Sequence, residues 1–391
     1  MLDESSRSFR IAMVAACPFP LDRGTPIRIE RMARSLTGRG HKVDVFTYHY
    51  GGDRPDDGLN IIRIRGSKRY ARTAPGPSPT KLALLDPQLA WRLYNATAGV
   101  RYDMIHAHHV EGLLVSQMAA RRRGLPLVFD VHALLGSELP FYRTSLPSTL
   151  VRRVGRVFDR ILPGMADHLI TVSGEIEQAI LQQGKLSQAD ITCIPNGVER
   201  ELFASNEITP ADQPTIVFAG NFAPYQGIEN LLEAFALVRT RVPDVRLVML
   251  SGSDFAPYRA QADALNISDA IEFRSVALSD LGDSLAKCAI AVNPRIDCAG
   301  LPQKLLNYMA AGCAIVSFEG SAKHIKNEES ALIVPDGSID AMARCIERLI
   351  RDSGLRRKLG QRAQEIARTE LSWEQAAARI EAVYTKLLAA R

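Results

Sequence analysis

Short apolar runs alternate with amphipathic stretches along most of the chain. The runs are short enough for single strands, and the amphipathic stretches repeat their apolar residues at the three- and four-residue spacing of a helix. This alternation is typical of βαβ units around a parallel sheet. In the first half it predicts strands at 11–16, 42–47, 60–65, 104–107, 127–131, 168–172 and 191–194. The pattern then restarts and predicts strands at 215–219, 245–250, 271–274, 289–293, 314–317 and 331–334.

A polar segment bounded by prolines separates the two series. Residues 195–214 read PNGVERELFASNEITPADQP, a composition typical of a linker. We therefore predict an α/β fold of two Rossmann-like domains, residues 1–200 and residues 205–370. The last segment, 371–391, places apolar residues at helical spacing and needs a surface to cover. We expect this C-terminal helix to cross back to the first domain.

Composition narrows the class of protein. Of the 391 residues, 46% are hydrophobic and 23% are charged, which is ordinary for a globular chain. The longest apolar runs are far short of the roughly 18–20 residues that span a bilayer. The six cysteines form no CxxC pair and have no clustered histidine partner, which argues against a zinc site and a disulfide framework. We expect a cytoplasmic protein.

Charge is distributed unevenly along the chain. Residues 1–205 contain 27 Lys and Arg against 20 Asp and Glu, a net charge of +7, and the remainder has a net charge of −2. A basic half is typical of a domain that meets membrane phosphates, a lipid-phosphate acceptor or nucleic acid, although ordinary surface variation also explains it. The basic stretches 121–124 and 143–162 lack the interleaved aromatic residues that stack bases. We therefore expect no nucleic-acid partner.

A glycine loop follows the first predicted strand. Gly24 and Thr25 lie where this strand leads into a helix, and a glycine there lets backbone N–H groups approach a phosphate. Neither GxGxxG nor GxxxxGK[ST] occurs in the chain, which disfavours a nicotinamide dehydrogenase and a P-loop enzyme. The loop by itself is equally compatible with a structural turn.

Polar residues also follow later strands of the first domain. The stretch FDVHALLGSEL places Asp130, His132 and Glu138 around one turn, so we expect His132 to face a ligand. The neighbouring group, His106, His108 and His109, is better explained by buried, hydrogen-bonded histidines, with a ligand role for His108 as the alternative.

The second domain contains a stronger candidate for anion binding. A predicted helix opens near Pro302, just after Cys298-Ala299-Gly300, and Arg295 and Lys304 lie close by in sequence. The N-terminus of a helix offers free N–H groups and a positive dipole. The sequence therefore predicts that an anion such as a diphosphate binds at this helix.

Taken together, these motifs resemble those of the family 4 glycosyltransferases, which are retaining enzymes of the GT-B fold. The matching stretches are RGTPIRIERMARSLTGRGHKVDVFT, DMIHAHH, LITVSGEI, IPNGVERELF, GNFAPYQGIENLLEAF and GLPQKLLNYMAAGCAIV. The resemblance implies two domains facing a cleft, a nucleotide-sugar donor held mostly by the second domain, and a glycan or lipid-linked acceptor on the first. It also implies a hexosyltransferase of cell-envelope polysaccharide or glycoconjugate synthesis.

The sequence departs from the family pattern where the chemistry occurs. The family usually has an Arg and, five residues later, a Lys after the first strand of the second domain, and here those positions are Asn221 and Gln226. It usually has two glutamates eight positions apart, and here those positions are Ala299 and Asn307. Three interpretations stay open: a divergent transferase, a GT-B scaffold without transferase activity, and a sugar-nucleotide epimerase on the same fold.

The resemblance assigns roles to individual positions. For donor binding it implies Gly24, Thr25, Arg28, Asn221, Gln226, Arg295, Ala299, Gly300 and Leu301. For catalysis it implies His132, Lys304 and Asn307, and for the acceptor side Asp130, Glu138 and His108. No Asp-x-Asp motif occurs, so we predict no metal, a metal-independent reaction and no cofactor.

One segment of the first domain suggests contact with a membrane. In residues 150–162, LVRRVGRVFDRIL, apolar residues recur at helical spacing and four arginines occupy other positions. The segment predicts either a core helix with a solvated basic face or a helix that docks reversibly on an anionic membrane. The second interpretation places the protein peripherally on the inner face of the plasma membrane.

Overall fold

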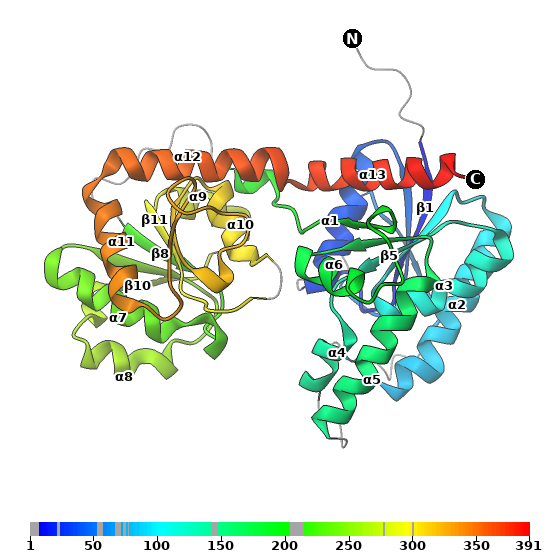
Figure 1. Cartoon of the computed structure of the whole chain (residues 1–391), viewed down its shortest axis with the longest axis horizontal. Helices are drawn as coiled ribbons and strands as arrows, with labels where there is room; N and C mark the ends of the chain where they lie inside the picture. Colours follow the sequence, from blue (N-terminus) through cyan, green and yellow to red (C-terminus); the bar gives the residue numbers. More distant parts are fainter. Residues whose placement is uncertain are drawn as a thin grey trace, which may run out of the picture. The chain divides into compact units, whose positions relative to one another are not determined.

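The computed structural model divides the chain into two compact units. It describes residues 8–21, 24–52, 58–66, 72, 76, 78–142, 147–203, 215–276, 278–298 and 301–391. One unit comprises Met1–Pro195 together with Ala376–Arg391, and the other comprises Asn196–Gln375 (Figure 1). Our sequence boundaries at 200 and 371 lie five residues from these divisions, and the boundary at 205 lies nine residues from Asn196.

The first unit is built on a seven-stranded parallel sheet of order β3-β2-β1-β4-β5-β6-β7. Its strands are β1 Arg10–Ala15, β2 Lys42–Thr47, β3 Asn60–Arg63, β4 Met104–His108, β5 Leu127–Val131, β6 His168–Thr171 and β7 Ile191–Cys193. Its helices are α1 Gly24–Gly38, α2 Asp86–Gly99, α3 His109–Arg123, α4 Leu135–Glu138, α5 Ser148–Ile161 and α6 Gly174–Leu181, with a π-helical turn at Lys81–Leu85.

The second unit is built on a six-stranded parallel sheet of order β10-β9-β8-β11-β12-β13. Its strands are β8 Thr215–Ala219, β9 Arg246–Leu250, β10 Ile271–Arg274, β11 Ile290–Asn293, β12 Ala314–Phe318 and β13 Leu332–Val334. Its helices are α7 Ile228–Arg241, α8 Ala256–Ala264, α9 Leu278–Ala286, α10 Gln303–Ala310, α11 Ile339–Arg351 and α12 Ser353–Glu370.

Both sheets confirm the α/β fold with two Rossmann-like domains. The central strands are mostly apolar because helices cover both faces of a parallel sheet, so almost every residue of β1, β4, β5 and β12 is buried, whereas the edge strands β3 and β10 are largely unburied. Each predicted strand is present, displaced by two residues at most. In each sheet the order reverses at one point, between β1 and β4 and between β8 and β11. Ligands of such sheets bind outside the carboxyl ends of strands at these switch points.

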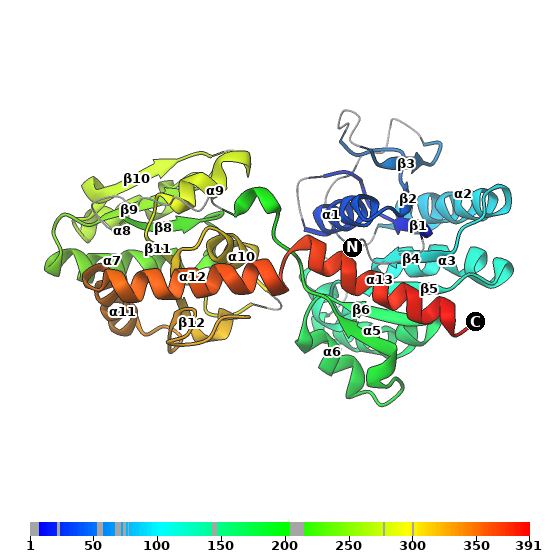
Figure 2. The same ribbon diagram turned by 90° about the horizontal axis from the view of Figure 1, so that it is seen from above.

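The C-terminal helix α13, Trp373–Ala389, confirms the expected return to the first domain, because residues 376–391 belong to the first unit. Figure 2 shows it running across the strands of that unit. Tyr384 is fully buried and its ring meets the ring of Phe9 edge-on, while Glu381 accepts hydrogen bonds from Arg39. The core of the first unit is therefore completed by the end of the chain.

Helix α5 is not the core helix with a solvated basic face that one interpretation predicted. Its buried positions are Val151, Gly155 and Asp159, whereas its other large apolar side chains are exposed. The exposed apolar residues are Leu150, Val154, Val157, Phe158 and Ile161. A Cβ on Gly155 would lie 2.6 Å from the Gly136 nitrogen, and Asp159 accepts hydrogen bonds from the Leu135 and Gly136 N–H groups at 2.7 and 2.8 Å. Capping of α4 by Asp159 and this close approach turn the apolar face outward.

The arginines of α5, Arg152, Arg153, Arg156 and Arg160, are also exposed. At 100° per residue they form a stripe separate from the apolar stripe, so the helix has an apolar outer face beside a basic one. Among the described residues, no helix is long and apolar enough to cross a membrane.

Candidate active site

Residues that follow three strands, Thr25 after β1, His109 after β4 and His132 after β5, meet at the switch point of the first unit. Thr25 lies in the first turn of α1, after β1, and His109 opens α3, after β4. The Thr25 hydroxyl lies 2.5 Å from His109 Nε2 and 3.3 Å from His132 Nδ1. The rings of His109 and His132 stack with centroids 4.4 Å apart. His109 also has a φ of 61°, a conformation that favours glycine and that concentrates at functional sites.

A buried ion pair lies next to this cluster. Arg28 Nε and Nη2 donate to Asp130 at 3.0 and 3.2 Å, and Nη2 also donates to the Ile194 carbonyl at 2.9 Å. Burial opposes ionisation of Asp130, but the Arg28 guanidinium and nearby histidines bring the pKa of its carboxyl well below the usual range. We predicted donor and acceptor roles for Arg28 and Asp130, whereas the structure places both inside the unit, 2% and 0% exposed, as partners of each other.

The histidines next to this pair are neutral at neutral pH. Burial lowers the pKa of His106, His108 and His132, although Asp130 acts in the opposite direction. His108 Nδ1 lies 3.3 Å from Asp130 Oδ2 and 3.2 Å from His132 Nε2. If the Nδ1–H of His108 is shared between these acceptors, His132 Nε2 accepts, and its Nδ1–H donates to Thr25. This chain of contacts fixes the plane of the His132 ring and, with that proton assignment, its tautomer.

The same buried residues could ligate a metal ion, but they fit one poorly. Potential ligand atoms of His106, His108 and Asp130 lie within 4.8 Å of one another. Arg28 already neutralises the Asp130 carboxylate and holds a fixed positive charge about 3.0 Å from it. A metal cation there would be repelled at close range by that guanidinium. We therefore treat the cluster as a hydrogen-bonded support for His132.

A cavity of about 560 Å³ opens beside this support, lined by residues of the first unit alone. Gly24, Thr25 and His132 line it, as does the predicted acceptor-side residue Glu138, which accepts a hydrogen bond from the Tyr142 hydroxyl. His108 and Asp130 do not line the cavity. Gly24, Thr25, His132 and Glu138 thus line one cavity, and the buried residues His108 and Asp130 lie next to it.

In the second unit, two glycines shape the loop after β8. Gly220 has a φ of +143° and Gly227 a φ of +72°, and a Cβ on Gly227 would lie 2.1 Å from the Pro294 carbonyl oxygen. Within this loop Asn221 Oδ1 accepts from the Gln226 side chain at 3.2 Å. The two amides that replace the usual cations therefore bind each other.

Lys304, from α10, extends into this loop. Its Nζ donates to Gln226 Oε1 at 2.5 Å and lies 3.9 Å from the centroid of the Phe218 ring. Burial, and then the charge of Arg295, lower the pKa of Lys304 to about 7. Among the described residues no carboxylate pairs with Lys304. A buried cation without a counterion, at the carboxyl ends of β8 and β11, is suited to an anionic ligand.

Other predicted donor residues surround Lys304. The guanidinium of Arg295 lies over the Tyr225 ring at 4.8 Å and its Nε donates to the Asp297 carbonyl. Asn307 is buried and accepts from the Gln303 side chain at 3.3 Å, while Leu301 is partly exposed before α10. The first turn of α10 contains no acidic residue that would oppose an anion.

Two predicted donor-binding residues, Ala299 and Gly300, lie outside the described residues.

Two models of known protein families match the chain. The family model named Glycosyltransferase Family 4 matches residues 23–202, and the one named Glycosyl transferases group 1 matches residues 199–366. The chain belongs to glycosyltransferase family 4.

Relatives and solved structures agree with this assignment. The chain is 24% identical over 97% of its length, and 97% of the relative's, to a D-inositol 3-phosphate glycosyltransferase of Corynebacterium glutamicum strain R. Its fold is similar to that of a sucrose-phosphate synthase from Thermosynechococcus elongatus, with a TM-score of 0.75, 21% identity, and coverage of 98% of this chain and 100% of that one. It is also similar to Anabaena HepE in complex with UDP, with a TM-score of 0.72, 16% identity and coverage of 97% and 100%. This family 4 chain is a glycosyltransferase of the GT-B fold.

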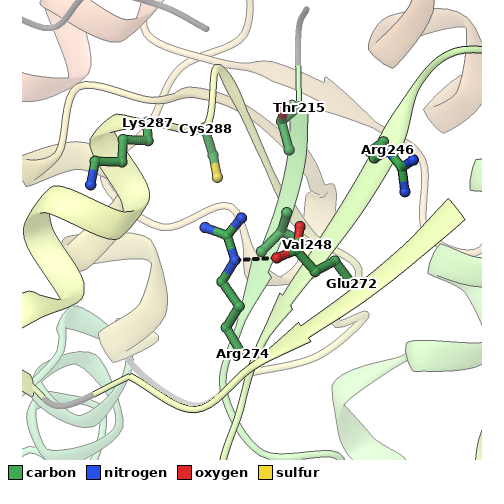
Figure 3. A pocket seen from close by; sticks show the side chains of 7 residues that line it. All are labelled: Thr215, Arg246, Val248, Glu272, Arg274, Lys287 and Cys288. Atoms are coloured by element: carbon green, nitrogen blue, oxygen red, sulfur yellow. Dashed lines mark hydrogen bonds and ion pairs between the residues drawn. The ribbon is translucent and has the colours of Figure 1, made fainter.

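A second hollow in this glycosyltransferase, of about 300 Å³, is not a candidate ligand site, because of its position in the sheet and its lining residues (Figure 3). Thr215 and Arg246, which line it, are the first residues of β8 and β9, so it lies toward the amino ends of these strands. Glu272 and Arg274 pair within it at 2.6 Å. It lies away from the carboxyl ends of the strands, where ligands of such sheets bind, and two of its charged side chains pair with each other, so we assign it no role in the reaction.

Sequence reasoning missed two residues of the support. His109 was grouped with structural histidines, although its place directly after a strand at the switch point was a usable signal. Tyr384, whose hydroxyl lies 2.6 Å from His106 Nδ1, gave no signal, because a tyrosine in an amphipathic C-terminal helix reads as an ordinary core residue.

Proposed function

We propose that this glycosyltransferase moves a sugar from a nucleotide-sugar donor to a glycan or lipid-linked acceptor with retention of configuration, without a metal ion. The observation that carries the proposal is Lys304, a buried cation bonded to Gln226. In the family pattern position 226 itself usually supplies that positive charge. Here α10 supplies it from the other side of the same switch point, so the charge is relocated within the site.

The donor diphosphate then lies against Lys304 and the first N–H groups of α10, with Arg295 as a second cation. Each charge-assisted hydrogen bond to phosphate contributes roughly 1.5–3 kcal/mol. As the sugar–phosphate bond breaks, negative charge accumulates on the diphosphate, and these fixed positive groups stabilise it without a chelated metal. Anabaena HepE, whose structure contains UDP, supports a nucleotide donor.

His132 orients the transferred sugar in this proposal. It is neutral, its plane is fixed by Thr25 and His108, and it lines the cavity of the first unit. Its ring can therefore exchange one of these hydrogen bonds for a sugar hydroxyl without gaining charge. Both ring nitrogens of His132 are held in hydrogen bonds, to Thr25 and to His108, so the role assigned to it is positioning and not attack on the anomeric carbon.

A binding experiment tests the donor site. Nucleoside diphosphates and their sugars are screened by thermal shift in the presence of EDTA, and the best ligand is titrated calorimetrically. Lys304→Ala is expected to weaken its binding about tenfold to a hundredfold, and Arg295→Ala less. Lys287→Ala is the matched control, because Lys287 is an exposed lysine beside the hollow at the opposite end of the strands. Equal affinity in Lys304→Ala and Lys287→Ala contradicts the proposed donor site.

We also propose that the first unit docks on anionic membranes through α5. The exposed apolar stripe of α5 lies beside four exposed arginines, and residues 1–205 have a net charge of +7. Each arginine near an anionic surface contributes on the order of 1 kcal/mol, and the contribution falls with salt. Co-sedimentation with liposomes is expected to require anionic lipid and to weaken when Arg152, Arg153 and Arg156 become Gln. Equal binding to neutral liposomes, or none to either kind, contradicts docking.

A further inference from the structure

We propose that the cavity of the first unit binds the hydrocarbon chain of an amphiphilic acceptor, which enters past Leu82, Leu114 and Phe158 and presents its hydroxyl-bearing head at Thr25 and His132. This inference rests on the proposed transfer reaction and names the acceptor class: a sugar or polyol attached to an apolar chain.

The wall of the cavity is mostly apolar; Glu111 also lines it, and most of the other polar side chains are engaged in hydrogen bonds. Tyr142 donates to Glu138, and Lys81 Nζ donates to the Gly76 carbonyl at 3.3 Å. Thr25 bonds to the two histidines in the wall. The wall between these groups consists of aliphatic and aromatic side chains such as Val110, Val131, Leu135, Leu139, Phe129 and Leu162. A free glycan needs many hydrogen-bond partners, which this wall does not offer, whereas a hydrocarbon chain needs none.

Three side chains connect the cavity to the surface. Leu82, Leu114 and Phe158 line the cavity, and yet they are 54%, 47% and 44% exposed. They come from the π-helical turn, α3 and α5, so three separate elements contribute to one apolar mouth. Exposed apolar groups of this size that border a cavity mark a binding surface.

The mouth is continuous with the apolar stripe of α5. Phe158 belongs to both, and Val154 and Ile161 lie one turn away from it along the helix. The exposed arginines beside that stripe complement anionic lipid headgroups, which favours a chain supplied from a lipid surface over an apolar peptide. A volume of about 560 Å³ lies within the range of small-molecule sites and suits one flexible chain.

The experiment measures how affinity depends on chain length. Glucose, n-octyl β-D-glucoside and n-decyl β-D-glucoside, each below its critical micelle concentration, are titrated calorimetrically into the whole protein. Each added methylene that leaves water is expected to raise affinity about threefold to fourfold, so the decyl glucoside binds roughly tenfold more tightly than the octyl glucoside. Glucose alone is expected not to bind measurably.

A matched pair of substitutions distinguishes the cavity from the surface. Leu114→Arg places a charge at the mouth, whereas Val157→Arg places one on the same exposed apolar surface at a residue that does not line the cavity. We expect decyl glucoside affinity to fall at least about tenfold in Leu114→Arg and less than about twofold in Val157→Arg. Leu82→Arg repeats the test from another element, in case one variant fails to fold.

Affinity that does not depend on chain length, or equal losses in Leu114→Arg and Val157→Arg, would overturn the inference. Nucleotide binding measured on the same proteins separates this failure from failure of the transfer reaction. If Leu114→Arg retains the nucleotide affinity of the wild type while chain length has no effect, the cavity assignment fails and the donor site stands. If the wild type binds no nucleotide sugar, the proposed function itself fails.

Discussion

The two units differ in whether the buried charge at the switch point is paired with an opposite charge. In the first unit, Arg28 has Asp130 as a bidentate partner, and the histidines around the pair are held neutral by burial. In the second unit, the partners of Lys304 among the described residues are an amide oxygen and an aromatic face, and its pKa is lowered to about 7. Arg28, whose charge is balanced by Asp130, stabilises the fold, whereas Lys304, whose charge is not balanced by a carboxylate among the described residues, is available to bind an anionic ligand.

The largest expected effect is the response of the first unit to acid. Burial lowers the pKa of His106, His108 and His132 from an ordinary value of 6.5, so below pH 6.5 the unfolded chain binds protons that the folded chain does not. The free energy of unfolding therefore decreases as the pH is lowered below 6.5, by up to about 1.4 kcal/mol per histidine per pH unit. Hydrogen exchange between pH 7 and pH 5 is expected to show the first unit opening before the second. Simultaneous opening of both units contradicts this.

Next in size is the same substitution made in both units. Arg28→Met leaves the Asp130 carboxylate buried and unpaired, and is expected to destabilise the first unit by about 3–5 kcal/mol. Lys304→Met removes a buried cation without a counterion, and is expected to leave stability unchanged or raise it by about 1–2 kcal/mol. Urea unfolding followed separately in each unit checks both signs. If both variants lose similar stability, the contrast between the two sites is wrong.

A smaller effect is expected in the pH dependence of donor binding. With a pKa of about 7, Lys304 loses most of its charge between pH 6 and pH 8.5. The Kd of the nucleotide sugar is therefore expected to rise about tenfold over this range, because a charged Lys304 holds the diphosphate more strongly. Lys304→Gln is the control: its Kd is expected to be nearly constant and close to that of the wild type at pH 8.5. A wild-type Kd that does not change with pH shows that Lys304 stays charged.

The smallest expected effect concerns the link from α13 to the histidines. Tyr384→Phe removes the hydroxyl that lies 2.6 Å from His106 Nδ1 and leaves a buried nitrogen without that partner. A loss of about 1–2 kcal/mol in the free energy of unfolding is expected, with little change in nucleotide affinity. Unfolding and nucleotide titrations on the same preparation test this. A large loss of nucleotide affinity would mean that the hydroxyl acts beyond the first unit's core.

The sequence predicted the sheets better than it predicted the sites. Strands such as Leu127–Val131 and Thr215–Ala219 are apolar except for Asp130 and Thr215, so their bounds can be read directly from the sequence. Lys304 was also predicted, because helix-start signals and a lysine were adjacent in sequence. The direction of its side chain toward Gln226 depends on a loop 78 residues away and could not be read locally.

The faces of α5 show why other features escaped prediction. The spacing of its apolar residues predicts an apolar stripe, and such a stripe ordinarily faces the core. The deciding contacts are Gly155 against Gly136 and Asp159 on the N–H groups of α4, and they depend on a tertiary neighbour. The cavity has the same origin, since its mouth combines three elements that no sequence window brings together.

The return of α13 imposes an order on biosynthesis. A ribosome releases residues 1–195 long before residues 376–391, and until then Phe9 and His106 lack Tyr384 as a neighbour. Residues 196–375 of the second unit are contiguous. This unit can therefore complete its fold before the last helix of the first unit has been synthesised. Deletions within α13, or bulky groups attached to it, are therefore expected to destabilise the amino-terminal half of the protein.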